Sequence, residues 1–527
     1  MKKIFYSTFV FTTLLFSCSD YLDSPNEDFT NNPESEGISP AQKLAGAQLN
    51  LLNNEVINYN VYGNRMTYAY GLNSGFTSSD AAYNFNFNSD TYTVGTWDNA
   101  YLYMDNLQDI IDTEAQFPEY LNHVAIAKVL KAQGMEKIVS LYGDAPYSEA
   151  FKSKEGITKP VFDDDKQIIM DLFDLLDEAR QNISDASSDA SILVPGGEDI
   201  VFNGDMAKWT QYANTLELRL LLRLSDTSDS DLVTLRTNRF ATLTNDFITE
   251  DVTFNPGFTG ATAAQSNPMF RVYGTNVAQT AWTQSNRANA AGDFIAQVIN
   301  GTLNTPTLVT TGVVDPRRAR MFTTISGTVQ GAVQGTETTI AKSRLAGYVH
   351  GYVNSGLGDQ YENGTERDAY VMLASESYFL QAEAAQRGYI SGDAQTLFNQ
   401  AITESFAFYS AGFGGTVGLY APLNAASYIA AIDSKVGLGW TATPDKINCI
   451  ITQKWLALSQ WTGIEPYFDF MRTGYPAVPL PSGVTQTSRP NRLIYPSSEY
   501  SSNSANTPSV SVSDLFTVNS KTPVYLQ

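Results

Sequence analysis

Apolar residues recur at helical spacing in several separate stretches of the chain. In residues 121–142 they stand three and four positions apart, and Gly143 with Pro146 closes the pattern. One side of this stretch therefore faces a core, as in an amphipathic helix. The same spacing predicts further helices at 101–114, 167–183, 206–224, 369–387 and 447–461.

The clearest helix pair is expected late in the chain. The helix predicted at 369–387 ends at Gly388, and Asp393 is placed to cap the next one, in which apolar residues repeat from Ala394 to Ser405. Small alanines on these faces allow close approach of two helices. Such pairs suggest tetratricopeptide-like units, but their irregular spacing excludes a regular repeat array. The fold class predicted is mainly α.

Three regions break the helical pattern. Residues 59–95 are rich in aromatic residues and asparagine, and residues 226–365 in threonine, glycine and short β-like runs. The tail from Tyr475 is full of proline and serine and is expected to wrap over the surface. We therefore predict a single domain, residues 39–527, whose helix pairs are joined to a large, irregular, loop-rich half carried on long insertions.

The first residues predict export and lipidation. Lys2 and Lys3 precede an apolar stretch that is too short to span a bilayer, and Ser17-Cys18 follows it like a bacterial lipobox. We expect residues 1–17 to be a signal peptide and Cys18 to carry the lipid, with acyl chains such as palmitate holding it stably in the membrane. Residues 18–38 then form a polar tether. The alternative is a plain signal peptide with an incidental cysteine.

The composition excludes several function classes. A formal net charge of −22 repels phosphate backbones, so no nucleic acid is expected as a partner. Two cysteines cannot build a disulfide framework, and two histidines are too few for a histidine-based metal cage. We expect no cofactor. The acidic run from Asp226 to Asp231 lacks the glycine and distal glutamate of an EF-hand loop, and a solvated turn is the favoured interpretation.

Catalytic motifs are missing from the sequence. No nucleophile elbow, zinc-protease helix or phosphate-binding loop occurs. A serine triad would have to use His123, expected on a helix, or His350, expected in a strand. Cys449 is expected to be a buried thiol. The sequence does not decide whether two carboxylates form a glycosidase site, because a chain with 55 acidic residues always offers some pair.

Two segments are candidates for ligand binding. In residues 59–103, aromatic residues are interleaved with asparagines, and we single out Tyr83, Phe85 and Trp97. The second segment runs from Tyr273 to Trp282, and Trp282 is the tryptophan expected to be most exposed. Aromatic faces stack on the C–H faces of sugars, while amides and hydroxyls pair with sugar hydroxyls. The alternative for the first segment is a strand whose aromatic face packs on the helices.

Eight motifs in order resemble one family across nearly the whole chain. They are CSDYLD at 18–23, LYGDAPYSEA at 141–150, NGDMAKW at 203–209, ANTLELRL at 213–220, ESYFLQAEAA at 376–385, QKW at 453–455, DFMRTGYP at 469–476 and YPSSE at 495–499. Each is weak alone, but the ordered set resembles the SusD/RagB outer-membrane nutrient-binding lipoproteins. The arginine-threonine-glycine-tyrosine-proline element is closer to the second variant of that family.

The resemblance implies a role and a partner. It implies a lipid-anchored outer-membrane protein, facing the exterior, that captures an oligosaccharide or a peptide. It also implies a SusC-like, TonB-dependent transporter that imports the nutrient, and it implies no enzyme activity. Two alternatives remain: a surface glycoside hydrolase, and a structural or adhesive lipoprotein. The motifs themselves are interpreted as scaffold, with Trp209 and Trp455 in the core and with Glu376, Glu383, Arg219 and Arg223 in ion pairs on helix surfaces or between helices.

Overall fold

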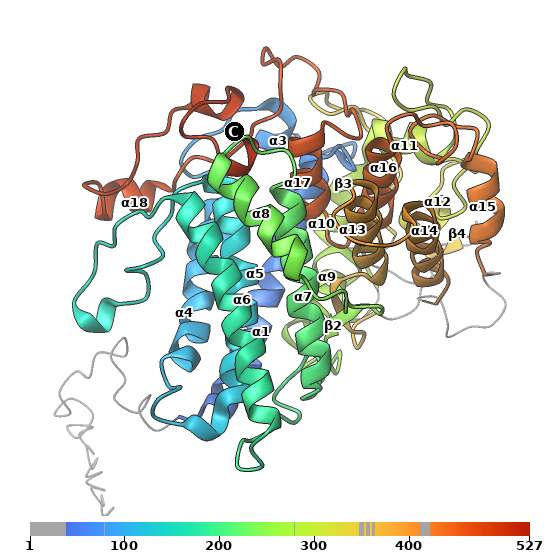
Figure 1. The fold of residues 1–527 in the computed structure, drawn as a ribbon. Coiled ribbons are helices and arrows are strands. Elements are labelled where there is room, and N and C mark those ends of the chain that lie inside the picture. The colour runs from blue at the N-terminus through green and yellow to red at the C-terminus, as the bar shows by residue number, and fades with distance from the viewer. Residues whose placement is uncertain are drawn as a thin grey trace, which may run out of the picture.

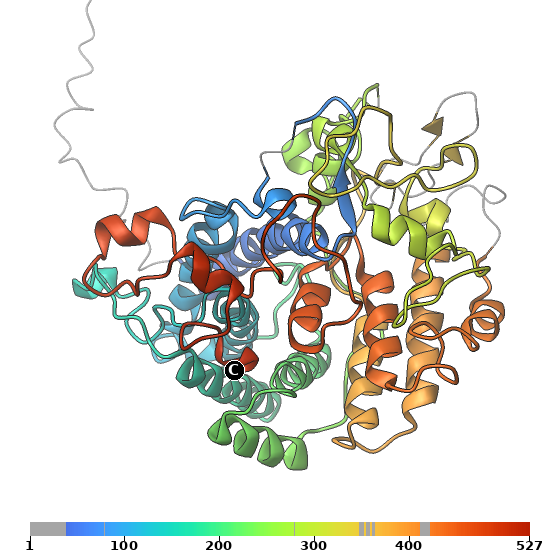
Figure 2. The same ribbon diagram turned by 90° about the horizontal axis from the view of Figure 1, so that it is seen from above.

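Helices fill one side of the molecule and loops the other. The structure, a computed structural model, describes residues 38–77, 80–278, 280–346, 353–354, 359–360, 364–411 and 422–527. Helices α1, α4, α5, α6 and α7 stand side by side, while the yellow-green part of the chain forms irregular loops away from them (Figures 1 and 2). Cys18, His350 and the expected signal peptide lie outside the described residues.

The helical side is built from helices that pack in neighbouring pairs. The most extensive packing is between α5 and α6 and between α13 and α14, and less extensive packing joins α1 to α4 and α13 to α16. The helices of this side are α1 (Pro40–Asn54), α2 (Asn60–Met66), α4 (Asn99–Ile111), α5 (Leu121–Tyr142), α6 (Asp165–Ser187), α7 (Met206–Arg223), α8 (Ser230–Thr242), α13 (Ala374–Gln386), α14 (Ala394–Ala411), α15 (Ala425–Ile432), α16 (Lys446–Leu458) and α17 (Ile464–Thr473).

Local sequence explains where these helices begin and end. Asp205 accepts hydrogen bonds from the backbone N–H groups of Ala207 and Lys208 at the start of α7 (3.1 and 3.2 Å). Asp393 accepts one from Thr396 N–H (2.7 Å) before α14. Such caps satisfy donors that have no partner within the helix. At the other end of α5, Gly143 has a φ of 75°, which glycine adopts without strain.

The predicted mainly α fold is confirmed, with changes of detail. Helix α5 has the predicted bounds. The predicted helix at 369–387 is shorter, because residues 369–372 form β6 and pair with another strand before the helix begins. Residues 59–95 and 226–365 were predicted to lack helices, but the structure places helices in both regions. They contain α2, α8 and several short helices, which lack the long apolar stripe that a periodicity argument needs.

The loop side has short helices and two-residue to four-residue strands. Its helices are α3 (Ala81–Asn84), α9 (Pro268–Tyr273), α10 (Gln284–Ala288), α11 (Asp293–Ile299), α12 (Arg318–Met321) and, in the tail, α18 (Ser497–Ser502). The strands pair antiparallel as β1 (Tyr70–Leu72) with β3 (Asn289–Ala291), β2 (Val252–Phe254) with β6 (Ala369–Met372), and β4 (Val353–Asn354) with β5 (Asp359–Gln360). Chain segments far apart in sequence are thus joined by small ladders.

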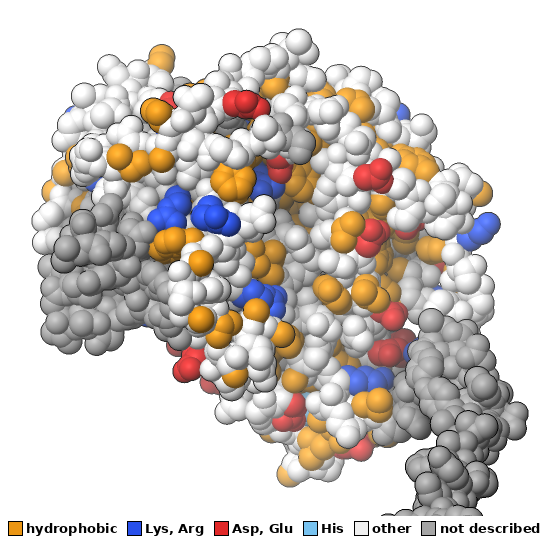
Figure 3. All heavy atoms as spheres, turned by 180° about the vertical axis from the view of Figure 1, so that it is seen from behind, with side chains coloured by type: hydrophobic (Ala, Val, Ile, Leu, Met, Phe, Trp, Pro, Cys, Tyr) orange, Lys and Arg blue, Asp and Glu red, His pale blue; other side chains and the backbone are white. Residues whose placement is uncertain are grey.

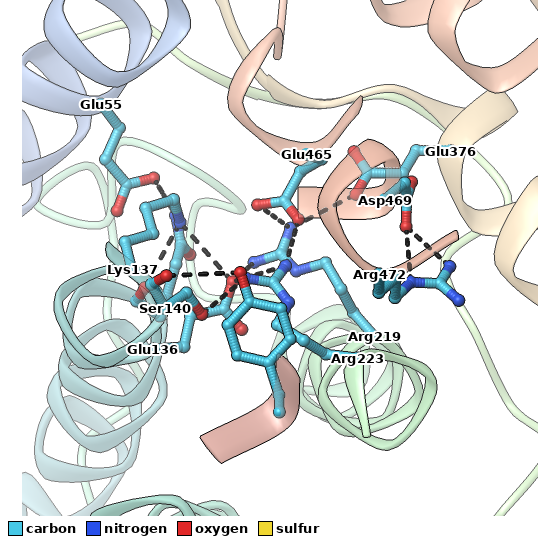
Figure 4. A network of polar contacts seen from close by, with 12 residues as sticks. Glu55, Glu136, Lys137, Ser140, Arg219, Arg223, Glu376, Glu465, Asp469 and Arg472 are labelled. Atoms are coloured by element: carbon cyan, nitrogen blue, oxygen red, sulfur yellow. Dashed lines mark hydrogen bonds and ion pairs between the residues drawn. The ribbon is translucent and has the colours of Figure 1, made fainter. Parts of the chain in front are cut away.

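A buried ionic network ties the helices together (Figure 4). Arg219 on α7 lies 2.8 Å from Glu136 on α5, 3.4 Å from Glu376 on α13 and 3.6 Å from Glu465 on α17. About two turns further along α17 and α13, Arg472 on α17 donates to both oxygens of Glu383 on α13 (2.6 Å each). These ion pairs are therefore between helices, and they hold the helix pairs in one arrangement.

The tail does more than wrap over the surface. Its residues Leu493, Tyr495, Leu515 and Tyr525 are buried in the main core. The guanidinium of Arg492 donates to three backbone carbonyls, among them that of Tyr142 at the end of α5. The prediction that the tail only wraps over the surface is therefore wrong, because short apolar runs such as Leu493-Ile494-Tyr495 and Val524-Tyr525 anchor it in the core.

Candidate functional site

Two turns of π-helix, one between α1 and α2 and one directly before α4, lie against each other. They are η2 (Glu55–Tyr59) and η3 (Val94–Asp98). Asn54 Nδ2 donates to the carbonyl of Gly95 (2.8 Å), and the Tyr59 hydroxyl donates to that of Thr96 (2.8 Å). A β-carbon on Gly95 would stand 2.6 Å from Asn58 Cβ, so glycine is required for this approach. π-Helical turns are frequent at functional sites.

An open cavity of about 430 Å³ lies over these two turns. A volume of this size suits a small ligand. Its wall mixes apolar side chains, phenols, amides and two charges. The lining residues are Ile57, Asn58, Val61, Tyr62, Arg65, Asp90, Tyr92, Val94, Gly95, Thr96, Asn99 and Tyr273.

Three tyrosines belong to the described wall; Tyr92 is half-buried, while Tyr62 and Tyr273 are buried (0% and 5% exposed). The rings of Tyr62 and Tyr92 meet edge to face with centroids 4.7 Å apart. Burial raises the pKa of Tyr273 to about 12. It also raises the pKa of Tyr92 well above the ordinary value, and the Asp80 carboxylate adds to that shift. Both phenols keep their protons at physiological pH, and the Tyr92 hydroxyl donates to the Asp80 carboxylate.

Charged groups anchor the rest of the wall. Arg65 forms an ion pair with Asp80, which also accepts the Tyr92 hydroxyl, and the guanidinium carbon of Arg65 lies 5.8 Å from the centre of the Tyr83 ring. Asp90, on the rim, is exposed and is the one acid among the described lining residues. A glycosidase requires a pair of carboxylates around the scissile bond. The described wall thus offers one carboxylate together with amides and phenols, groups that can bind polar ligands.

Three of the residues expected to contact ligand are in the core. Tyr83, Phe85 and Trp97 are each 2% exposed, which leaves none of their faces open in this structure. The Trp97 ring packs on Tyr142 (centroids 4.8 Å apart), and its Nε1 donates to Glu499 (3.2 Å). Burial does alternate from 83 to 88, aromatic in and asparagine out, as the strand alternative required. No strand forms there, because residues 81–84 are helix α3 and Phe85 at its end has a φ of 57°.

The second candidate segment reaches the cavity through Tyr273. Tyr273 is buried at its wall, beside Arg65 from the first segment. Trp282 is half-buried and not among the lining residues, and the guanidinium of Arg344 covers its ring at 4.4 Å. The expected exposure of Trp282 is thus only partial. The sequence analysis did not single out the lining residues Asn58, Arg65 and Asn99. For the two asparagines, the high asparagine content of this segment was the available signal.

The other cluster of carboxylates is too tightly packed to be an active site. Glu55, Lys137, Arg219 and Glu465 border a cavity of about 20 Å³. That volume is about enough for one water molecule, and a sugar ring cannot enter it. Within the network, burial opposes the charge of Glu465, but Arg219 and Arg223 outweigh it and bring the pKa to about 2. The network is scaffold.

The other described residues that were considered for catalysis or metal binding have structural roles. Cys449 is buried, and burial raises the pKa of its thiol to about 12, as expected for an unreactive cysteine. His123 is 1% exposed and lies 3.2 Å from Glu198. Asp226 pairs with Arg387 and Asp229 caps α8, so the acidic run is structural. The described residues hold no cluster of metal-ligating side chains.

Charged and apolar side chains are dispersed over the face seen from behind. In Figure 3, apolar side chains lie in small groups between polar atoms, with acids and bases scattered among them. In the part of the chain that the structure describes, no helix combines the length and apolarity of a membrane span.

A family model covers most of the sequence. The family is SusD-like, described as starch-binding and associating with the outer membrane, and its model matches residues 31–496. The chain belongs to this family. The family is defined by binding and not by catalysis, in agreement with the expectation of a binding protein. No curated protein matches the sequence.

Solved structures share the SusD-like fold. A chitin-binding protein is 23% identical, with a TM-score of 0.66 over 89% of this chain and 95% of its own. A chitin-binding SusD homologue from Flavobacterium johnsoniae is 20% identical, with a TM-score of 0.66 over 88% and 94%. A SusD homologue from Bacteroides fragilis is 18% identical, with a TM-score of 0.68 over 89% and 94%. At these identities the likeness concerns the fold.

Proposed function

We propose that this protein captures an oligosaccharide at the cell surface in the cavity over η2 and η3. The observation that carries the proposal is the wall of that cavity, where tyrosine rings stand among the amides of Asn58 and Asn99. Sugar rings need both an aromatic face and hydrogen-bonding partners for their hydroxyls. Membership of a family described as starch-binding supports a carbohydrate, and the chitin-binding relatives make β-linked N-acetylated sugars the first ligands to test. A peptide is the second ligand class.

Capture serves import through a partner. A protein held at the surface by a lipid on Cys18 can bind a nutrient but cannot move it across the membrane. We therefore propose a SusC-like, TonB-dependent transporter as its partner, in line with the family's association with the outer membrane. Cross-linking followed by gentle detergent extraction should bring down a large barrel protein. Recovery of the lipoprotein alone would contradict this part of the proposal.

Asn99 offers a clean test of the cavity. It is half-buried in the wall, and no described residue hydrogen-bonds to its side chain, so Asn99→Ala should fold normally. Losing one hydrogen bond of about 0.5–1.5 kcal/mol lowers affinity about twofold to tenfold. Asn106→Ala is the matched control, since Asn106 is exposed two turns further along the same helix.

The assay is a thermal-shift and calorimetric screen of chito-oligosaccharides, malto-oligosaccharides and peptides. It uses chain carrying Cys18→Ala, which needs no detergent. Ligand-dependent stabilisation argues against a purely adhesive role. Release of shorter products from a bound oligosaccharide would establish the hydrolase alternative. Equal affinities of Asn99→Ala, Asn106→Ala and the parent would remove this cavity from the site.

A further inference from the structure

A second cavity opens on the same helical segment as the cavity over η2 and η3. It has a volume of about 340 Å³, within the range of small-molecule sites. The two cavities share no lining residue, but η3 runs directly into α4. This continuous segment lines the first cavity between Val94 and Asn99 and the second between Tyr101 and Asp105. Capture of a ligand in the first cavity therefore leaves an adjoining cavity without a role.

One exposed helix face runs from the first cavity to the second. Val94 in the first wall is 63% exposed, and Leu102 in the second wall is 60% exposed. Asp98 stands halfway between them in sequence and is exposed as well. Helical residues four positions apart lie on the same face, so these three side chains form a line. At a rise of about 1.5 Å per residue, the line from Asn99 to the end of the second wall is about 9 Å long.

The C-terminal tail borders this line on its other side. Ser497 donates to Asp90 on the rim of the first cavity. Ser498 Oγ lies 3.5 Å from Asp98 Oδ1, and the next residue, Glu499, lines the second cavity. Ser497 and Ser498 are exposed. The stretch between the two cavities thus carries hydroxyl and carboxylate groups that a passing ligand can reach.

The wall of the second cavity combines apolar and hydrogen-bonding groups. The half-buried rings of Tyr101 and Phe151 have centroids 5.9 Å apart, and Leu102 adds exposed apolar surface to the same wall. Asp105 and Ser153 are exposed, and no described residue hydrogen-bonds to their side chains. Apolar and aromatic surfaces suit the C–H faces of sugars, while the carboxylate and the hydroxyl suit sugar hydroxyls.

We infer that the two cavities form one extended site for a linear oligosaccharide, whose chain lies along the exposed face of η3 and α4 and passes Asp98. The inference rests on the proposed capture of an oligosaccharide and adds the chain length that the protein selects. A chain long enough to fill both cavities makes the second set of contacts without a second loss of overall motion. The second wall is also held in place, because the Tyr101 hydroxyl donates to the Pro146 carbonyl (2.8 Å) and Trp97 Nε1 donates to Glu499 (3.2 Å).

Calorimetry with ligands of two lengths tests the inference. The probes are the disaccharide and the hexasaccharide of the N-acetylated chito series and of the malto series, titrated into the full chain carrying Cys18→Ala. In the series that binds, the hexasaccharide should bind at least about twentyfold more tightly than the disaccharide. A six-unit chain offers five overlapping two-unit stretches, so counting alone accounts for about fivefold. A ratio at or below about fivefold would overturn the inference.

A double variant locates the gain in the second cavity. Leu102→Ala with Asp105→Ala removes an apolar contact and a carboxylate from two exposed helix positions, so the fold should persist. The ratio of the two affinities should then fall to about fivefold or less. Val194→Ala with Asn106→Ala is the matched control, because both residues are exposed and line neither cavity, and it should keep the parent ratio. Asn99→Ala should lower both affinities alike.

The outcomes separate this inference from the proposed function. A large ratio that persists in the folded double variant would overturn the extended site, while weaker binding by Asn99→Ala would still support capture in the first cavity. Disaccharide binding without a gain in affinity from length would have the same meaning. If the double variant fails to fold, the ratio measured on the parent decides. Absence of binding by all four probes would refute oligosaccharide capture and its extension together.

Discussion

Glu383→Ala should strongly destabilise the protein by uncovering a buried charge. Glu383 on α13 accepts two hydrogen bonds from Arg472 on α17 at 2.6 Å, and both side chains are 1% exposed. Arg387 also lies 2.9 Å from the same carboxylate. Without it, Arg472 keeps Asp469, which Lys454 already shares at 2.9 Å, and a longer ion pair with Asp226 at 3.8 Å. Breaking a buried pair by removing one partner costs about 3–5 kcal/mol.

Thermal unfolding measures this effect. For a chain of this length the entropy of unfolding is about 1 kcal/mol per degree, so the Tm should fall by about 3–5 °C. Lys154→Ala is the control, because its ion pair with Asp109 is at the surface (side chain 61% exposed) and should contribute about 0–1 kcal/mol. Replacing both partners, as in Glu383→Leu with Arg472→Met, should be less destabilising than Glu383→Ala. A loss below about 1 kcal/mol for Glu383→Ala would refute the reasoning.

Three further predictions concern pH, the cavity and the anchor. Burial raises the pKa of Asp165 to about 7, above its ordinary value of 3.8. The protonated form therefore stabilises the fold at low pH, and this stability is lost as the pH rises from about 4 to 7. The variant Asp165→Asn keeps an acceptor for Val524 N–H, so it should raise the denaturant midpoint at pH 8 and leave it unchanged at pH 4. Gly95→Ala should push η3 away from Asn58 and weaken ligand affinity in calorimetry. Cys18→Ala should lose its acyl mass and leave the membrane fraction; unchanged retention would contradict lipidation.

The sequence predicted the helical scaffold well for a physical reason. Helix α6 buries one face over several turns, so its apolar residues recur at a period that is visible without a structure. Helix α5 is buried on nearly all sides, so the prediction that only one side of it faces the core is wrong. Asp393 and Gly143 marked helix ends in the sequence, because a cap satisfies local backbone groups and depends on few distant contacts. The strand at 369–372 was missed because its pairing with β2 is more than a hundred residues away in sequence.

The candidate site was harder to predict than the scaffold. Composition singled out residues 59–103, and several residues of this segment line the cavity, but composition did not tell which aromatic rings are buried. Trp97 follows Val94 by three residues, yet Val94 is 63% exposed and Trp97 2%. That difference depends on Tyr142 and Tyr495, which come from α5 and from the tail and pack on the Trp97 ring. No local pattern carries this information.

The cavity over η2 and η3 owes its shape to the same core that hides the tryptophan. Below the surface, Tyr59 and Asn54 hold η3 by hydrogen bonds to its carbonyls, while Asn58 and Val94 remain at the cavity. The buried residues thus fix the backbone from which the ligand-facing residues project. A wall that is already ordered loses little side-chain and loop freedom when ligand binds, so more of the contact energy appears as affinity. This is why we expect Gly95→Ala, which touches no ligand group, to weaken binding as surely as removal of the Asn99 amide.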